Sequence, residues 1–415
     1  MNRLKNKKKI INDPIYGFIK IKYDLIYDLI EHSYFQRLRR IKQLGLTNYV
    51  YPGANHTRFQ HALGAMHLME QAVEVIRSKG NDISIEEEQA VTAAILLHDI
   101  GHGPFSHALE NTIIEKLNHE ELSLLIMEAL NEQFDNNLEL TITIFKNNYH
   151  KKYLHELVSG QLDMDRLDYL KRDSFFTGVN EGVIGEDRII KMLNIFNGQL
   201  VSEQKGIYSI ERFLTARRLM YWQVYFHKTV IAAEQLLENL LLRAKDLAKQ
   251  QIEVFATPSL HFFLYGCDFN LNDKNDSVKL IEHFINLDDN DIITSAKEWA
   301  KHDDFILSQL SQNLLNRKLS HVEITDTRNP ENMGKIKELV LQKYKLKNDT
   351  DLKYFINSEI ISNHTYAPSE ENIRILMNNR SIKDLNEVSD IINLGGLTKL
   401  TEKYFICYPK DILVS

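Results

Sequence analysis

Histidines are concentrated in one short stretch of this 415-residue chain. Seven of the sixteen histidines lie within residues 56–119, and the centre of that stretch reads His98-Asp99-Ile-Gly-His102-Gly-Pro-Phe-Ser-His107. Residues 90–97, just before this block, are apolar on nearly every side, which predicts a central buried helix that ends at His98 and Asp99. A fold built around such a helix brings an imidazole and a carboxylate together at one interior point.

A histidine followed directly by an aspartate can offer one nitrogen and one oxygen ligand to the same cation. Mn, Fe, Co, Ni and Zn accept such a mixed set. The preceding helix can supply His61, and the helix around Asp163-Met-Asp165 can supply Asp165, which gives four ligands with His98 and Asp99. Metal-bound water becomes nucleophilic near neutral pH, so the pattern predicts a one-metal hydrolase site. The alternative is a hydrogen-bonded core pair, the commoner role of a lone His-Asp pair.

Two glycines favour the metal site over the core pair. Gly101 and Gly103 are costly in a helix, and they allow the backbone to approach a ligand closely. His102 and His107 then fall at the mouth of the site. We therefore expect metal-dependent hydrolysis.

The hydrophobic pattern predicts a mainly α fold, a helical core with a small C-terminal α/β appendage. Seventeen Gly and seven Pro are few, which favours helices. A short hairpin or an extended segment is expected at 13–21, helices over 25–44, 57–77, 84–99, 108–134 (two), 162–172, 210–250 (with room for one break) and 251–320, and strands over 352–361, 373–377 and 404–408. This divides the chain into a core over 1–250, a helical extension over 251–320 and a smaller α/β region over 321–415.

Composition restricts the location and the binding surface. With a net charge of −7, a polyanion must find its positive charge in a pocket. No apolar run approaches the length of a membrane span, and the basic N-terminal segment lacks the apolar stretch of a signal peptide. That segment is interpreted as a solvated tail, with a phosphate or nucleic-acid contact as the alternative. Two cysteines, Cys267 and Cys407, cannot form a disulfide framework and indicate a reducing cytoplasm.

Several segments within about residues 13–240 share a pattern with a known family. They are Asp13-Pro-Ile-Tyr-Gly, Phe35-Gln-Arg-Leu-Arg39, Ile41-Lys-Gln-Leu-Gly45, Tyr51-Pro-Gly-Ala-Asn-His-Thr-Arg-Phe-Gln-His61, the block from His98 to His107, and Gln161-Leu-Asp-Met-Asp-Arg-Leu-Asp-Tyr-Leu-Lys-Arg-Asp173. The chain resembles HD-domain phosphohydrolases. Within them it is similar to the deoxynucleoside triphosphate (dNTP) triphosphohydrolases, which include bacterial dGTPases and the SAM-and-HD-domain enzyme of animals.

The resemblance implies a set of catalytic residues and a reaction. The family's metal ligands fall on His61, His98, Asp99 and Asp165; its catalytic or phosphate-contacting histidines fall on His102, His107 and His119; the carboxylate paired with the last falls on Glu110. The animal enzyme has Asp at this last position, so the longer side chain keeps the charge but shifts its reach. The implied reaction is hydrolysis of a dNTP, with dGTP favoured, to deoxynucleoside and inorganic triphosphate. One divalent transition metal (Mn, Fe, Ni, Co or Zn) is implied, with additional Mg on the triphosphate.

Further residues are candidates for substrate contacts. Arg58, one turn from His61, can bind phosphate oxygens bidentately; its alternative is a surface helix charge. Arg217, Tyr221 and Tyr225 are spaced by four and share a helix face, where the alternative is a set of core aromatics. The resemblance adds contacts to the triphosphate, sugar and base at Gln43, Arg166, Tyr169 and Asp173. A tight fit around C2′ would explain a preference for deoxynucleotides.

The resemblance also implies partners. An activating nucleotide at a subunit interface would fall on Glu31, Gln36 and Arg39, and a homo-oligomer (dimer, tetramer or hexamer) would use the 210–250 helix or the C-terminal region. Single-stranded nucleic acid is a further candidate partner, through the basic tail and the cluster at 37–42.

Two other functions stay open at this stage. Another HD phosphohydrolase, such as a nucleotidase or a cyclic-nucleotide phosphodiesterase, would need no triphosphate clamp, so Arg58, Arg166 and Arg217 argue against it. A nucleotide- or nucleic-acid-binding regulator without turnover would have little use for an intact ligand set.

Overall fold

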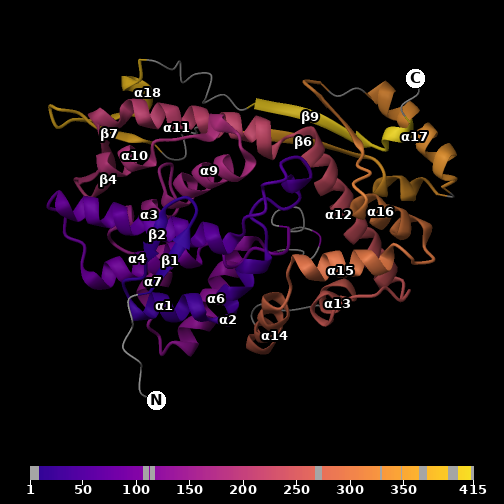
Figure 1. Cartoon of the computed structure of the whole chain (residues 1–415), viewed down its shortest axis with the longest axis horizontal. Coiled ribbons are helices and arrows are strands. Elements are labelled where there is room, and N and C mark those ends of the chain that lie inside the picture. The colour runs from indigo at the N-terminus through magenta and orange to yellow at the C-terminus, as the bar shows by residue number, and fades with distance from the viewer. Residues whose placement is uncertain are drawn as a thin grey trace.

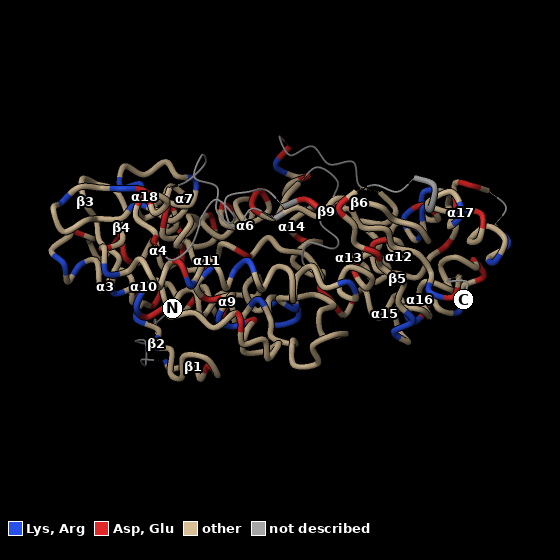
Figure 2. The backbone as a smooth tube through the Cα atoms, turned by 90° about the horizontal axis from the view of Figure 1, so that it is seen from above, with Lys and Arg blue, Asp and Glu red and all other residues tan. Residues whose placement is uncertain are grey.

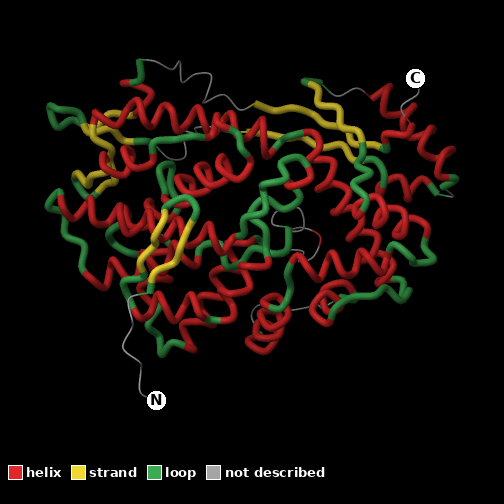
Figure 3. Tube along the Cα trace, in the orientation of Figure 1, coloured by secondary structure: helices red, strands yellow, loops and turns green. Residues whose placement is uncertain are grey.

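The computed structural model describes residues 9–105, 112, 117–266, 273–327, 330–346, 348–363, 372–390 and 401–412. Helices dominate the described chain, as the sequence predicts, and three small sheets accompany them (Figure 3). The molecule is elongated, with the N-terminal helices toward one end and α12, α13 and α15 to α17 toward the other (Figure 1). Basic and acidic residues are interspersed along the chain (Figure 2). Among the described helices, none is long and apolar enough to cross a membrane.

Three buried helices form the centre of the N-terminal half. α3 (Arg58–Ser78) packs against both α4 (Ile85–Leu97) and α9 (Met164–Thr177). α4 begins at a capping box, in which the Ser84 side chain accepts from the Glu87 backbone amide and the Glu87 carboxylate accepts from the Ser84 amide. Nearly all of α4 beyond its first turn is buried, which confirms the predicted central helix.

The other helices surround this centre or extend the molecule. In the first 250 residues they are α1 (Asp24–Glu31), α2 (Ser33–Gln36), α6 (His119–Gln133), α7 (Glu139–Phe145), α8 (Lys152–Val158), α10 (Glu186–Met192), α11 (Ile207–Met220) and α12 (Lys228–Lys249). Beyond them lie α13 (Pro258–Leu264), α14 (Lys274–Ile285), α15 (Asp289–Trp299), α16 (Phe305–Leu315), α17 (Pro330–Tyr344) and α18 (Leu385–Val388). One continuous hydrophobic core runs through both groups.

The strands form three separate sheets. β1 (Ile10–Asp13) and β2 (Gly17–Lys20) make the predicted N-terminal hairpin. A second sheet has the order β3 (Leu193–Phe196), β4 (Gln199–Glu203), β7 (Arg374–Leu376), β8 (Ile382–Asp384), and a third has the order β5 (His321–Thr325), β9 (Thr401–Tyr408), β6 (Asn357–Asn363). Because β7 pairs in parallel with β4, the C-terminal residues contribute to two sheets at different places in the molecule. The division into three parts at 250 and 320 stays a prediction.

The structure corrects several predicted elements. The helix expected over 25–44 is broken at His32, where the backbone is extended (ψ 140°), and continues as α2 and a 3-10 turn (Arg37–Arg40). The helical region expected over 210–250, for which one break was allowed, is confirmed as α11 and α12, which are separated by a π-helical turn (Tyr221–Tyr225). The strand expected over 352–361 begins instead with a 3-10 turn (Asp349–Tyr354), and only its second half is β6.

Other elements were not expected or lie outside the described residues. Strands β3, β4 and β5 were not expected, because each is only four or five residues long and too short for a clear alternating pattern. One of the two helices expected over 108–134 is α6; the other falls mostly outside the described residues.

Candidate active site

Four side chains from three helices converge at the end of α4. His61 comes from α3, His98 and Asp99 follow the last turn of α4, and Asp165 comes from the first turn of α9. His61 Nε2 lies 3.1 Å from Asp165 Oδ1 and 3.6 Å from Asp99 Oδ2. His98 Nε2 lies 3.3 Å from Asp99 Oδ1 and 3.5 Å from Asp165 Oδ1. The fold thus brings together the four residues that the sequence singled out as metal ligands.

The chemistry of these four side chains fits a divalent metal. The Nε2 atoms of His61 and His98 are buried and make no hydrogen bond within the described residues. One ligand atom from each of His61, His98 and Asp99 lies within 4.8 Å of the others. Buried polar atoms without partners are costly, so a cluster of them aimed at one point indicates a missing ligand. Two imidazole nitrogens with carboxylate oxygens suit a borderline transition metal.

A second layer of contacts fixes how the two imidazoles are oriented. His61 Nδ1 lies 2.8 Å from Asp168 Oδ2, and His98 Nδ1 lies 2.6 Å from the Ile95 carbonyl oxygen. Each acceptor takes the Nδ1 proton and leaves the Nε2 lone pair pointing inward. Asp168 is itself held by Arg172, whose Nε and Nη2 donate to it at 2.9 and 3.0 Å and whose Nη1 donates to Asp13 at 2.9 Å.

Gly64 makes this second layer sterically feasible. A Cβ at this position of α3 would lie 2.0 Å from Asp168 Oδ1 and 2.3 Å from Arg172 Nη2. Any side chain would therefore push the buried Asp168–Arg172 pair away from His61.

The predicted role of the two glycines after α4 is corrected. A Cβ on Gly101 would lie 2.3 Å from the backbone oxygen of His119 and the backbone nitrogen of Ser123, so Gly101 allows close packing against α6 and not against a ligand. A Cβ on Gly103 would meet only Phe284, at an ordinary 3.8 Å.

The cluster also shifts the pKa values of its members. Burial lowers the pKa of His61, but the carboxylates of Asp165 and Asp168 outweigh it and raise that pKa to about 10. Burial acts in the opposite direction on Asp165, yet contacts with His61 and His98 hold its pKa well below the usual range. The carboxylates thus favour positive charge at this point, which protons or a metal cation can supply.

The two carboxylates of the cluster, Asp99 and Asp165, line a cavity of about 470 Å³. Its wall includes six of the residues predicted to contact substrate: Gln43, Arg58, Tyr169, Asp173, Tyr221 and Tyr225. The π-helical turn presents Tyr221 and Tyr225 to this cavity, with their rings edge to face at 5.1 Å. Tyr225 donates its hydroxyl to Asp173 at 2.7 Å, and the other oxygen of Asp173 lies 2.8 Å from Nε2 of buried His56.

Two predicted catalytic histidines meet in the same wall. His102 and His119 are stacked with their ring centroids 4.1 Å apart, and both line the cavity. His102 Nε2 lies 3.2 Å from Asp99 Oδ1. Arg58 is buried, and its Nη1 donates a hydrogen bond to the other oxygen of Asp99. Asp99 therefore connects Arg58 and His102 to the four-residue cluster. The other two predicted residues, His107 and Glu110, lie outside the described residues.

The remaining predicted contacts lie away from the cavity wall. Arg166 Nη1 is 3.3 Å from Asp163 Oδ2, and buried Arg217 sits 5.9 Å from the Tyr221 ring; neither lines the cavity. The proposed regulatory residues are near one another on α1, α2 and the following turn. Gln36 donates to the Ile30 carbonyl and accepts from Arg39, while Glu31 is exposed.

Sequence reasoning missed an acidic residue in the cavity, Glu234 of α12. Burial raises its pKa from 4.5 to about 7, and the charge of Glu238 adds to the rise. A glutamate within the apolar stripe of a helix was the available signal, because carboxylates rarely occupy such positions without a use.

Sequence reasoning also missed Arg37 and Asp289, which together hold the loop after α4. Arg37 is fully buried and donates to three carbonyl oxygens, those of Leu287 (2.8 Å), His102 (2.9 Å) and Ile100 (3.4 Å). Asp289 accepts from the backbone amides of Phe105 (2.8 Å) and Lys42 (3.0 Å). The α14–α15 segment therefore anchors the loop that carries His102.

Comparison with known proteins agrees with this geometry. Residues 58–173 match the HD domain and residues 184–257 match the HD-associated region. The YwfO protein of Bacillus subtilis is 32% identical, over 98% of this chain and 94% of its own length. A phosphohydrolase of known structure from Bacteroides thetaiotaomicron is 51% identical, with a TM-score of 0.92 over 97% of this chain and 100% of that one. The chain belongs to the HD-domain phosphohydrolase family.

The HD domain contains all four residues of the candidate metal-binding cluster, and the HD-associated region contains Tyr221, Tyr225 and Glu234. The similarity extends to a dNTP triphosphohydrolase, SAMHD1 of Bos taurus, which is 28% identical over 68% of this chain and 58% of that protein. The predicted resemblance is thus confirmed at the level of the family.

Proposed function

We propose that this HD-domain protein is a metal-dependent dNTP triphosphohydrolase with a preference for dGTP. The observation that carries the proposal is that Asp99 and Asp165, the two carboxylates of the His61, His98, Asp99 and Asp165 cluster, line a cavity whose wall also contains Arg58, three tyrosines and Asp173. A volume of about 470 Å³ is suitable for a nucleotide-sized ligand.

The four-residue cluster would hold one Mn, Fe, Co, Ni or Zn ion. Such an ion, when bound, lowers the pKa of water and polarises a phosphate oxygen. Arg58 provides a fixed positive charge beside Asp99 for the phosphate chain. His102 and His119 line the same wall and are the groups available to donate a proton to the leaving 5′-oxygen.

The far wall supports recognition of a deoxynucleoside. Tyr169, Tyr221 and Tyr225 provide aromatic surface for a base or sugar. The Tyr225 hydroxyl already donates to Asp173, so a ribose 2′-hydroxyl beside this pair would find little unused hydrogen-bonding capacity.

Glu234 supports guanine as the preferred base. No hydrogen bond or ion pair joins it to another residue of the described chain, and it lines the cavity. An ionised carboxylate only accepts hydrogen bonds. Guanine offers two adjacent N–H donors on its Watson–Crick edge, whereas the corresponding edges of the other bases place an acceptor there.

The test is incubation of the purified protein with each dNTP and with GTP, in Mn and then in Mg, followed by chromatography of the products. Deoxynucleoside with intact triphosphate is the expected outcome, and His98→Ala should abolish it while His261→Ala, on α13 outside the cavity, should not. Release of monophosphate or single phosphate would assign a different HD phosphohydrolase. Binding without turnover in any metal would indicate a regulator.

The same proposal includes a homo-oligomer located in the cytoplasm. Light scattering during size-exclusion chromatography, with and without dGTP, measures the first. Residues Glu31, Gln36 and Arg39 stay the proposed site of an activating nucleotide, and an all-Ala triple variant with unchanged nucleotide dependence would remove them.

A further inference from the structure

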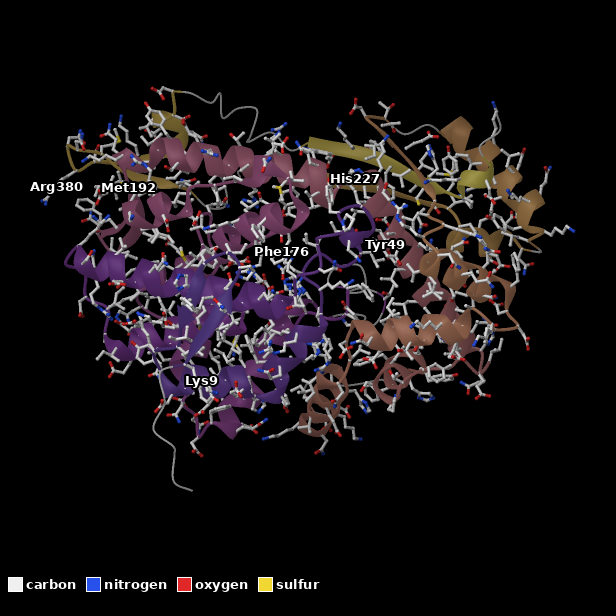
Figure 4. All side chains as sticks on the ribbon, viewed as in Figure 1. Lys9, Tyr49, Phe176, Met192, His227 and Arg380 are labelled. Atoms are coloured by element: carbon white, nitrogen blue, oxygen red, sulfur yellow. The ribbon has the colours of Figure 1, made fainter. Side chains whose placement is uncertain are left out.

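His56 is a buried histidine that lies beside the active-site cavity without lining it. It belongs to the loop before α3, and its side chain is fully enclosed. Its ring stacks on Phe176 with the ring centroids 4.6 Å apart and the planes inclined by 17°. Phe176 belongs to the last turn of α9 and lies near the middle of the molecule (Figure 4). A buried imidazole is costly unless its polar atoms are used, so the contacts of His56 indicate its role.

One nitrogen of His56 is committed to a residue of the cavity wall. Nε2 lies 2.8 Å from Asp173 Oδ1, whereas Nδ1 is buried and has no partner within the described residues. A carboxylate only accepts hydrogen bonds, so Nε2 carries the proton and donates it to Asp173. Nδ1 keeps its lone pair, because a proton there would find no acceptor. His56 is thus a fixed donor to Asp173.

Asp173 is held at both of its oxygens. It is buried in the cavity wall, and its second oxygen accepts from the Tyr225 hydroxyl at 2.7 Å. Among the described residues, His56 and Tyr225 are the side chains that donate to this carboxylate. One donor at each oxygen fixes the plane of the carboxylate, and the carboxylate in turn fixes the position of the Tyr225 hydroxyl.

The backbone of His56 holds a second part of the same wall. Its carbonyl oxygen accepts from the Gln43 amide at 3.0 Å, and Gln43 lines the cavity. The loop also packs closely on the end of α9, because a Cβ on Gly53 would lie 2.4 Å from the Phe176 carbonyl oxygen. His56 therefore connects two parts of the cavity wall that are distant in the sequence.

We propose that His56 is a positioning residue for sugar recognition, which holds Asp173 and Tyr225 in an arrangement that admits a deoxyribose and rejects a ribose. This role rests on the proposed dNTP activity and extends it to a residue outside the cavity wall. A carboxylate held at both oxygens cannot turn to accept a 2′-hydroxyl, whereas a carboxylate that has lost one donor can.

The test compares kcat/KM for dGTP and for GTP in the full-length protein. His56→Phe keeps an aromatic ring on Phe176 but removes the donor to Asp173, so the dGTP-to-GTP ratio should fall about tenfold or more. His56→Gln, whose side-chain amide reaches the position of Nε2, should keep the ratio within about threefold of the wild-type value. His67→Phe, at a partly buried histidine of α3 that does not line the cavity, is the matched control and should leave the ratio unchanged.

A double-mutant cycle with Tyr225→Phe separates positioning from a general loss of structure. Tyr225→Phe removes the other donor to Asp173 and should itself lower the ratio. If His56 acts through Asp173 and Tyr225, adding His56→Phe to Tyr225→Phe should change the ratio by less than about twofold. Equal losses of turnover for dGTP and GTP, or an undiminished effect of His56→Phe in the Tyr225→Phe background, would overturn the role of His56.

The wild type distinguishes the role of His56 from the proposed function. Equal kcat/KM for dGTP and GTP would overturn the role, because there would be no discrimination to maintain. An enzyme without any dNTP turnover would refute the proposed function. The dissociation constants of dGTP and GTP, measured by calorimetry in EDTA, would then test His56 separately, and an unchanged ratio of the two constants in His56→Phe would refute its role. If His56→Phe does not fold, His56→Asn, whose shorter amide does not reach Asp173, replaces it with the same expected result.

Discussion

Replacing Glu234 with Gln should stabilise the protein above neutral pH. Burial raises the pKa of Glu234 from 4.5 to about 7, so between these values the folded protein keeps a proton that the unfolded chain has lost. Wild-type stability therefore falls with rising pH across this window, by about 1.4 kcal/mol per pH unit and about 3 kcal/mol in all. Gln is neutral at every pH and escapes this loss.

The assay is thermal unfolding of both proteins between pH 4 and pH 8.5. At about 2.1 cal/mol/K per residue, about 3 kcal/mol corresponds to a gain in melting temperature of about 3–4 °C above pH 7, shrinking toward zero below pH 4.5. Glu282→Gln, an exposed carboxylate on α14, is the control and should show no such window. If the difference in melting temperature between wild type and Glu234→Gln were the same at all pH values, the raised pKa of Glu234 would be refuted.

The same substitution, Glu234→Gln, should reduce the preference of the enzyme for dGTP over dATP. If the ionised Glu234 reads guanine, the wild-type preference for dGTP over dATP in kcat/KM should rise about tenfold from pH 6 to pH 8, as the carboxyl ionises through a pKa of about 7. Glu234→Gln should flatten this rise, because an amide presents one donor and one acceptor at all pH values. If the preference for dGTP still rises with pH in the variant, Glu234 does not recognise the base, even where its effect on stability is confirmed.

The other predictions concern the groups around the metal cluster. Asp168→Asn should weaken metal binding by about 10–100-fold, since the carboxylate orients His61, and metal analysis after dialysis measures it against Asp187→Asn on α10 as control. Gly64→Ala should cost at least about 2 kcal/mol of unfolding free energy through its clash with Asp168, whereas Gly185→Ala, which has open space, should cost far less; equal melting temperatures would contradict the clash. Arg37→Gln should lower kcat with little change in KM, because the loop that carries His102 loses its anchor; unchanged kcat in a folded variant would count against this role. A chelator should lower the melting temperature and Mn should restore it, because Mn at a hundred times its dissociation constant adds about 2.7 kcal/mol to the free energy of unfolding.

Local patterns in the sequence were sufficient for the central helices. Ser84 and Glu87 specify the start of α4 through a capping box, and the apolar residues that follow can be buried only at the centre of a fold. His98 and Asp99 then sit at its end whatever surrounds them, because their position depends only on the residues immediately before them.

Other features depended on contacts between distant segments. β4 and β7 are paired across about 170 residues, Asp168 and Arg172 need the gap at Gly64, and Glu234 becomes a cavity residue only when α12 packs beside the turn at 47–49. Helical periodicity shows which side of a helix is apolar but not which neighbour it meets.

The sequence alone thus determined the fold class and the place of the candidate site: a mainly helical chain with an imidazole–carboxylate cluster at the end of a buried helix. Only the tertiary structure decided which carboxylates support the imidazoles, which arginine anchors the loop with His102, and which acid lines the cavity beside the cluster. The physical reason is that residue type and spacing fix local hydrogen bonds and burial, whereas the partner of a buried charge is set by packing between segments far apart in the chain.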